Sequence, residues 1–157
     1  MKKQIVSIIV AALAGATSFG ADHQNLEEGL PVSVEDAYPI AYRGREIQSV
    51  FRYDRTHDDK NRVTLEPRIE LGIAPNTEFE IRAPFYLGNA DRTGSGDIAL
   101  GVLYNFNTES LMLPAFSLGA EGVVPTGKDS RGFDTAVKFI VTKSVSKSGL
   151  DRIHLNL

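Results

Sequence analysis

Two runs of alternating apolar and polar residues, joined by Pro75-Asn76, constrain the fold of this chain more than any other feature. In residues 63–74 the large aliphatic side chains occupy odd positions and the charged ones occupy even positions, and residues 77–87 continue the alternation. Successive side chains of a β-strand point to opposite faces, so the two runs predict a hairpin with one apolar face and one charged face. Such a hairpin suits a half-buried soluble sheet, and it equally suits a membrane barrel with lipid outside and water inside.

The same period recurs along the chain and predicts more strands. They are expected at residues 46–55, 97–107, 113–124, 135–145 and from 152 onward. Strands of about ten residues suit a tilted crossing of a bilayer. The connections alternate between long polar loops and short turns, as outer-membrane barrels do. Together these features favour an all-β, antiparallel up-and-down transmembrane β-barrel, of which this chain supplies about six or seven strands.

Strand parity places most charged side chains on one face of the predicted sheet. In a barrel this face surrounds water, whereas in a soluble sheet it would be a solvated surface with cross-strand ion pairs. The candidate lumen-lining residues are Arg52, Glu66, Arg68, Glu70, Glu80, Arg82 and Glu121. Pro67 and Pro84 lack the N–H group that a strand ladder uses, so we expect them to mark bulges or strand ends.

The N-terminus has the pattern of an export signal. Lys2 and Lys3 precede an apolar run of roughly a dozen residues, and Ser18 and Gly20 supply the small residues of a cleavage site after position 20. The apolar run is shorter than the roughly 20 residues of a spanning helix. Residues 1–20 are therefore predicted to be a signal peptide, and the mature protein is expected to be exported to the outer membrane of a Gram-negative bacterium.

Between the signal and the first strand lies a polar, turn-rich stretch, residues 21–45. Pro31 and Pro39 within it do not permit a long helix. We expect an irregular lead-in that packs against, or inside, the sheet formed by residues 46–157.

The sequence offers little that indicates catalysis, a metal or a cofactor. There is no cysteine, and the three histidines have no ligand spacing. Residues 122–129 resemble a phosphate loop, but Asp129 stands where Ser or Thr is needed and no helical pattern follows. The glutamates beside Arg68 and Arg82 are better explained as ion pairs than as an acid–base pair. We expect no enzyme activity and no cofactor. A net charge of −3 without a basic block also argues against nucleic-acid binding.

Four segments carry a resemblance to a known family. They are NLEEGLPVSVEDAYPIAYRGREIQ (25–48), EPRIELGIAPNTEFEIRAPFY (66–86), GSGDIALGVLYNFN (94–107) and EGVVPTGKDSRG (121–132). With these segments the chain resembles the bacterial outer-membrane proteins named for the meta-pathway of phenol degradation. The resemblance covers roughly residues 25–157, and its motifs are structural rather than catalytic. It implies a barrel that passes small aromatic or hydrophobic compounds, with outer-membrane lipid and a small solute as partners.

Length is where the sequence departs from that family. A single-chain outer-membrane barrel normally has an even number of at least eight strands, so six or seven leave an open edge. We expect either a truncated chain, which we favour, or several chains that associate to close one barrel. The alternative function is a secreted or periplasmic β-sheet protein that binds a hydrophobic ligand, and solubility without detergent would favour it.

Overall fold

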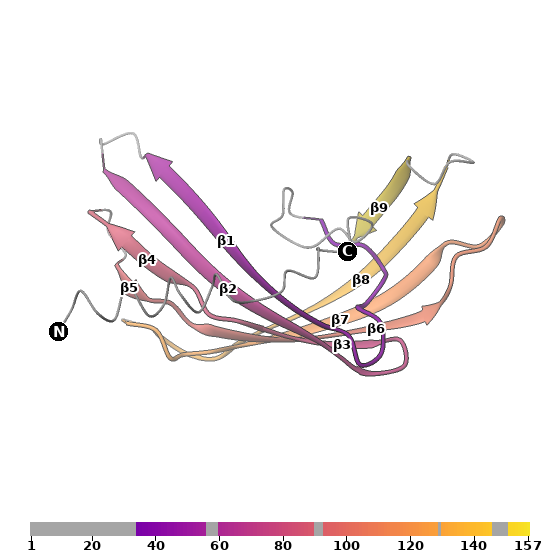
Figure 1. The fold of residues 1–157 in the computed structure, drawn as a ribbon, viewed down its shortest axis with the longest axis horizontal. Helices are drawn as coiled ribbons and strands as arrows, with labels where there is room; N and C mark the ends of the chain where they lie inside the picture. The colour runs from indigo at the N-terminus through magenta and orange to yellow at the C-terminus, as the bar shows by residue number, and fades with distance from the viewer. Residues whose placement is uncertain (1–33, 56–59, 90–92, 129, 146–150) are drawn as a thin grey trace.

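The computed structural model describes residues 34–55, 60–89, 93–128, 130–145 and 151–157 (Figure 1). The predicted signal peptide and the first part of the predicted lead-in lie outside the described residues. Among the described residues, no helix is long and apolar enough to cross a membrane.

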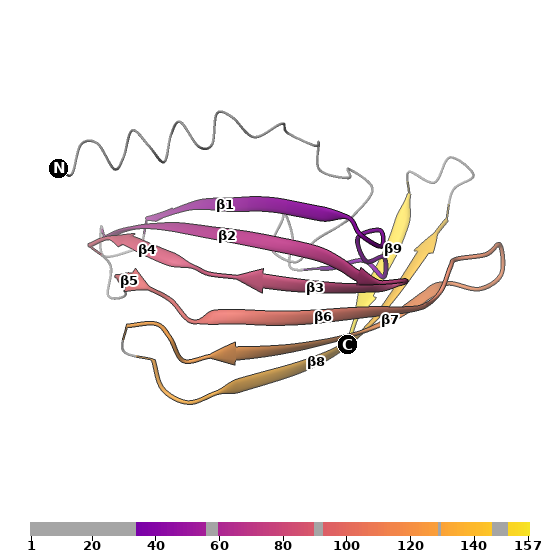
Figure 2. The same ribbon diagram turned by 60° about the horizontal axis from the view of Figure 1, so that its bottom comes forward.

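The described residues form one antiparallel sheet. Its strands are β1 (Arg45–Arg55), β2 (Asn61–Ala74), β3 (Thr77–Arg82), β4 (Phe85–Gly88), β5 (Gly94–Ser95), β6 (Ile98–Asn107), β7 (Ala115–Val124), β8 (Asp134–Ser144) and β9 (Arg152–Asn156). Strands β3 and β4 both pair with β2, while β6 pairs with β3 and β5 pairs with β4. Strands β3 and β4 are therefore two parts of one interrupted strand, and β5 and β6 are two parts of the next. Counted in this way, the sheet has seven positions that follow chain order (Figure 2).

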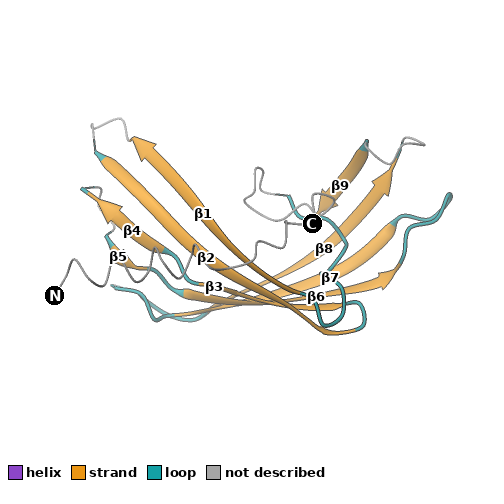
Figure 3. Ribbon diagram, viewed as in Figure 1, coloured by secondary structure: helices purple, strands orange, loops and turns teal. Residues whose placement is uncertain are grey.

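The sheet curls into a trough, with β1 on one arm and β9 on the other (Figure 1). Figure 3 shows strands joined by loops and turns throughout the described chain. An antiparallel, up-and-down sheet that curls in this way confirms the predicted partial β-barrel. Its strands agree with the expected ranges to within a few residues, because a period of two is read directly from the sequence.

The two prolines that conflict with a regular ladder lie at one irregularity. Pro84 sits between β3 and β4, where the strand is interrupted. Pro67 lies opposite in β2, and its carbonyl accepts a hydrogen bond from the N–H of Ala83 at 3.1 Å. Because the N–H and C=O of one strand residue point to the same side, the missing N–H of Pro67 faces this interruption. The expectation that the prolines mark bulges or strand ends therefore holds for Pro84 but is wrong for Pro67, which lies within the continuous strand β2 and faces the interruption.

The connection between β6 and β7 is longer than the five residues that separate the two strands expected from the sequence. It spans residues 108–114, so β7 begins at Ala115 rather than at position 113. Pro114 cannot donate to a ladder, and the Asn107 side chain instead bonds to the Pro114 carbonyl and the Phe116 N–H. At the tip of this connection Leu111 is 96% exposed.

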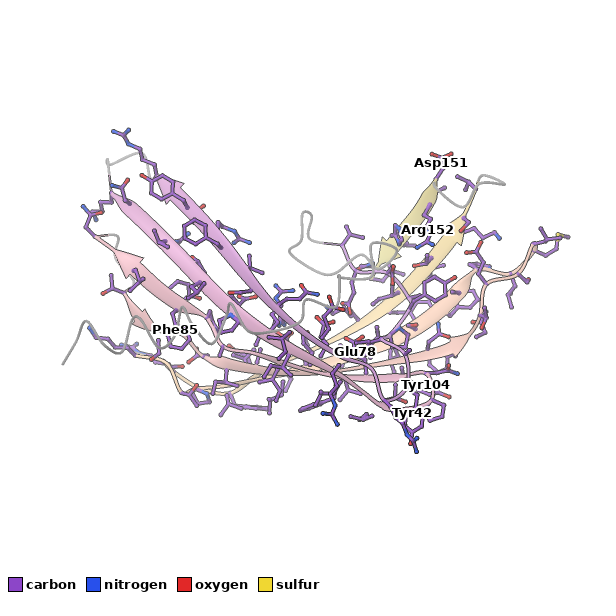
Figure 4. All side chains as sticks on the ribbon, viewed as in Figure 1. Tyr42, Glu78, Phe85, Tyr104, Asp151 and Arg152 are labelled. Carbon is purple, nitrogen blue, oxygen red and sulfur yellow. The ribbon has the colours of Figure 1, made fainter. Side chains whose placement is uncertain are left out.

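The two faces of the sheet differ sharply in polarity. Figure 4 shows Glu78 on the concave side and Tyr104 on the convex side. Large apolar side chains of the convex face are exposed, with Ile47 at 80% and Val137 at 69%. Charged side chains of the concave face are buried, with Arg68 at 5% and Glu70 at 3% exposed. This distribution is the reverse of a soluble protein, where large apolar groups lie inside and charges lie outside.

Candidate functional site on the concave face

Charged residues on the concave face of β1, β2 and β3 form two adjacent rows. The strand register places Glu46, Glu70 and Glu80 side by side in one row. The next row along the strands contains Arg68 opposite Arg82. Like charges directly opposite each other are unfavourable on a sheet, so the arrangement depends on pairing between the rows.

That pairing is provided by contacts along and diagonally between strands. Within β2, Arg68 lies 2.7 Å from Glu66, and it also lies 4.0 Å from Glu80 of β3. Within β3, Nε of Arg82 lies 3.3 Å from Glu80. Each arginine is thus next to carboxylates, which offsets part of the cost of burying its charge. We call Glu66, Arg68, Glu70, Glu80, Arg82 and Glu121 the charge ladder.

Arg82 extends the charge ladder beyond its own neighbours. Its guanidinium forms an ion pair with Glu121 of β7, two strand positions away. The concave-face residues of β6 that lie between them are small: Ala99 is opposite Arg82, and Gly101 is opposite Glu121. Small residues here leave a path for the long side chain of Arg82 across β6.

The seven sequence-predicted residues all lie at concave-face positions of the register. Six of them form the charge ladder, whereas Arg52 lies apart, opposite Thr64 and exposed. A role in lining a lumen remains a prediction for all seven.

A second cluster, which the sequence reasoning did not single out, holds the lead-in segment (residues 34–44). Ala37 is fully buried, and its N–H donates to Oγ1 of Thr142 at 2.9 Å. Its carbonyl accepts from Nδ2 of Asn105 at 2.7 Å and from Oγ of Ser117 at 2.5 Å. The available signal was the polar character of Asn105, Ser117 and Thr142, which share concave-face parity on three neighbouring strands.

The neighbouring residue Glu35 is held in a similar way. Its N–H donates to Oδ1 of Asn156 at 3.0 Å, and its carbonyl accepts from Nδ2 of the same amide at 2.9 Å. The carboxylate of Glu35 pairs with Lys138 at 2.7 Å, and that of the buried Asp36 lies 3.9 Å from Arg152. Residues 35–40 therefore bond to side chains of the concave face, whereas Arg43 bonds to the end of β2 and Arg45 already belongs to β1.

The lead-in segment also contacts the connection between β6 and β7. The Tyr38 hydroxyl donates to Oε2 of Glu109 at 3.2 Å. Burial raises the pKa of Tyr38 above its ordinary value, and the neighbouring Glu109 carboxylate raises it further.

Glu109 itself has a strongly shifted pKa. Burial alone would raise it, but hydrogen bonds from the Lys143 ammonium and from the backbone and hydroxyl of Ser144 outweigh burial and lower the pKa to about 2. The Lys143 contact is 2.9 Å. Glu109 thus ties the β6–β7 connection to the end of β8.

Two hollows lie where the lead-in segment meets the sheet, and the larger one, about 530 Å³, is lined by Tyr38, Glu109 and Lys143. The smaller hollow, about 20 Å³, has room for one water molecule. Its lining includes Glu35, Glu78, Glu80, Glu121 and Lys138. In the part of the chain that the structure describes, no group of three or more histidine, aspartate and glutamate side chains is placed to hold a metal ion.

Comparison with protein families gives one match. The model of the family described as "Putative MetA-pathway of phenol degradation" matches residues 42–149, which is most of the chain. The chain belongs to this family. The resemblance seen in the sequence is thereby confirmed, and the matched region runs from the end of the lead-in segment through β8. No curated protein and no solved structure matches the chain. Family membership and the curled antiparallel sheet are compatible with an outer-membrane β-barrel.

Proposed function

We propose that the chain forms the wall of an outer-membrane β-barrel through which small solutes pass passively, without catalysis. The concave face would line the lumen, and the charge ladder would set which solutes pass. Rings of charged side chains govern selectivity in many pores, because a narrow polar passage concentrates their field.

The observation that carries this proposal is the reversed polarity of the sheet. On the convex face, apolar side chains of neighbouring strands are exposed together, among them Phe51, Leu65, Leu100, Val102, Leu118 and Ile153. A contiguous apolar surface of this kind needs a partner other than water. Lipid is the partner that suits a curved, one-sheet wall whose other face is charged and ion-paired.

Closure of the barrel requires more strands than the seven described positions. Within the described residues, β1 pairs only with β2 and β9 pairs only with β8, so one edge of each has no strand beside it. Unpaired backbone groups cannot stay exposed in lipid. We propose that further strands pair with these edges, and association of several chains is one way to supply them.

The solute class follows from the lining and from the family. Carboxylates accept hydrogen bonds and guanidinium groups donate them, so the lining favours small molecules with polar groups over wholly apolar ones. The family description refers to phenol degradation. We therefore propose small aromatic compounds that carry a hydroxyl or carboxylate group.

The proposal is tested first by location and assembly. Membranes from expressing cells are fractionated, and the protein is run on a detergent gel with and without boiling. We expect an outer-membrane band whose mobility changes on boiling, and the unboiled size distinguishes one chain from several. A protein that remains soluble without detergent and shows no shift would overturn the proposal and support a periplasmic binding protein.

Passage of solutes is tested next, in liposomes that contain the purified protein. Swelling in isotonic arabinose or benzoate measures entry of a neutral and an aromatic anionic solute, and liposomes without protein supply the baseline. Swelling at the baseline rate for both solutes would rule out passive transport by the assembled protein.

A further inference from the structure

We infer that the lead-in segment is a releasable plug, seated in the lumen by side chains that recognise its main chain. The inference rests on the proposed function and assigns regulation to the same passage.

Much of the hold is on main-chain groups, in addition to the side-chain pairs of Glu35 with Lys138 and of Asp36 with Arg152. Both the N–H and the carbonyl of Ala37 are bonded by side chains of the sheet, and so are both main-chain groups of Glu35. The N–H of Ile40 donates to Oε2 of Glu78 at 2.8 Å. The side chains involved are Asn105, Ser117, Thr142, Asn156 and Glu78, from five different strands.

This arrangement separates the lead-in segment from the fold of the sheet. Strands β3 and β6 to β9 are held together by their own backbone ladders. The side chains that hold Ala37 and Glu35 therefore take no part in those backbone ladders. Release of residues 35–40 would leave this strand pairing intact, while Arg43 and Gly44 stay bonded to Gly72 of β2, so that part of the segment can leave without unfolding the wall.

Apolar contacts add little to the hold. In the described residues, the fully enclosed apolar cluster consists of Ala37, Leu103, Ala115 and Ile140, with Tyr38 packed against it. Hydrogen bonds in a water-filled passage are exchanged for bonds to water when the segment leaves, so each contributes only modestly to the seated state. Loss of individual bonds should therefore shift the balance between the seated and the released segment.

The seated segment lies on the concave face beside the charge ladder. Glu35 reaches Lys138 of β8 and forms one side of the hollow whose other walls include Glu80 and Glu121. Glu35 thus covers part of the charge ladder on the concave face. A solute that follows the charge ladder would meet the lead-in segment there.

The test compares two isosteric changes on the concave face. Thr142→Val with Ser117→Ala removes two of the bonds to Ala37, whereas the control, Thr64→Val, alters a buried concave-face threonine of β2. Each lost bond should favour release about fivefold, or about 25-fold together. In planar bilayers we expect the double variant to show a larger mean conductance than the parent protein and Thr64→Val.

A second measurement reports release without a current. The chain has no cysteine, so a single Ala37→Cys is a clean reporter for a bulky maleimide, and Ile40→Cys serves if the first does not assemble. Labelling should be slow in the parent background and about 25-fold faster in the double variant. Ala136→Cys, at an exposed concave-face position of β8, should label at the same rate in both backgrounds.

The outcomes distinguish the two proposals. Currents that are equal in the double variant and in Thr64→Val, with equal labelling at position 37, would overturn the plug and leave the transport function standing. Absence of current in every protein would overturn the transport function, and with it the plug as a regulator of passage.

Discussion

Arg82 of β3 forms an ion pair with Glu121 of β7 across the intervening strand β6. The contact joins non-adjacent strands through their side chains. It is possible because the concave-face residues of β6 between them, Ala99 and Gly101, are small. Arg82 also lies 3.3 Å from Glu80, so one guanidinium serves two carboxylates. Loss of either charge should therefore change the net charge of the lining directly.

Arg82→Gln is expected to make the passage more selective for cations. The change leaves Glu80 and Glu121 without their shared guanidinium, and uncompensated carboxylates attract cations. Glu121→Gln should shift selectivity the opposite way, and the double variant Arg82→Gln/Glu121→Gln should return toward the parent value. Reversal potentials in a potassium chloride gradient measure the effect. An unchanged reversal potential in both single variants would show that this pair does not line the passage.

Gly72→Ala is expected to destabilise the protein, whereas Gly101→Ala should be tolerated. A Cβ atom at position 72 would lie 2.0 Å from the backbone oxygen of Ala41, where the lead-in segment meets β2. The Gly72 N–H and carbonyl also bond to Gly44 and Arg43 there. A Cβ at position 101 would lie at an ordinary 3.4 Å from Oε2 of Glu80. We expect a loss of about 1–3 kcal/mol for Gly72→Ala.

The stability difference between these two glycine variants can be read from urea unfolding in detergent. Equal unfolding midpoints for Gly72→Ala and Gly101→Ala would contradict the close approach of Ala41 to β2.

Glu109 should make stability depend on acid pH. Its pKa is about 2 in the folded protein, below the ordinary value of 4.5, so its contribution is fully present above pH 4.5. The contribution is lost as the pH falls from 4.5 toward 2. Glu109→Gln should therefore be less stable than the parent at neutral pH, and the difference should shrink in acid. Urea unfolding midpoints between about pH 2 and 7 measure this difference in stability. The control is Tyr38→Phe, which removes one hydrogen bond to the same carboxylate.

Val102→Arg is expected to prevent membrane assembly, and Ala136→Arg should permit it. Val102 lies on the convex face in the middle of β6, 42% exposed, whereas Ala136 lies on the concave face of β8. Arginine at the middle of a lipid-facing surface costs about 2–4 kcal/mol, while a water-filled interior accepts it. The heat-modifiable band in the outer-membrane fraction is the measurement. Normal assembly of Val102→Arg would favour a water-exposed sheet.

The faces of the strands were predictable because side-chain alternation is a local property. The parity of residues 63–74 placed Arg68 and Glu70 on one face and Ile69 on the other, and the register agrees. Pro84 likewise indicated an irregular position from its missing N–H alone. Family membership was also visible in the sequence, since the segments that carry it are continuous.

Only the tertiary structure decided which residues far apart in the chain are in contact. The bonds that hold Ala37 come from residues 68, 80 and 105 positions away, and nothing in the local pattern of Asn105, Ser117 or Thr142 names Ala37 as their partner. The pairing of Arg82 with Glu121 likewise depends on strand order and on the small residues of β6. By itself the sequence determined which face each side chain occupies, because that follows from the geometry of one strand. Which side chains meet across the curved face was decided by long-range register, because register depends on the whole sheet.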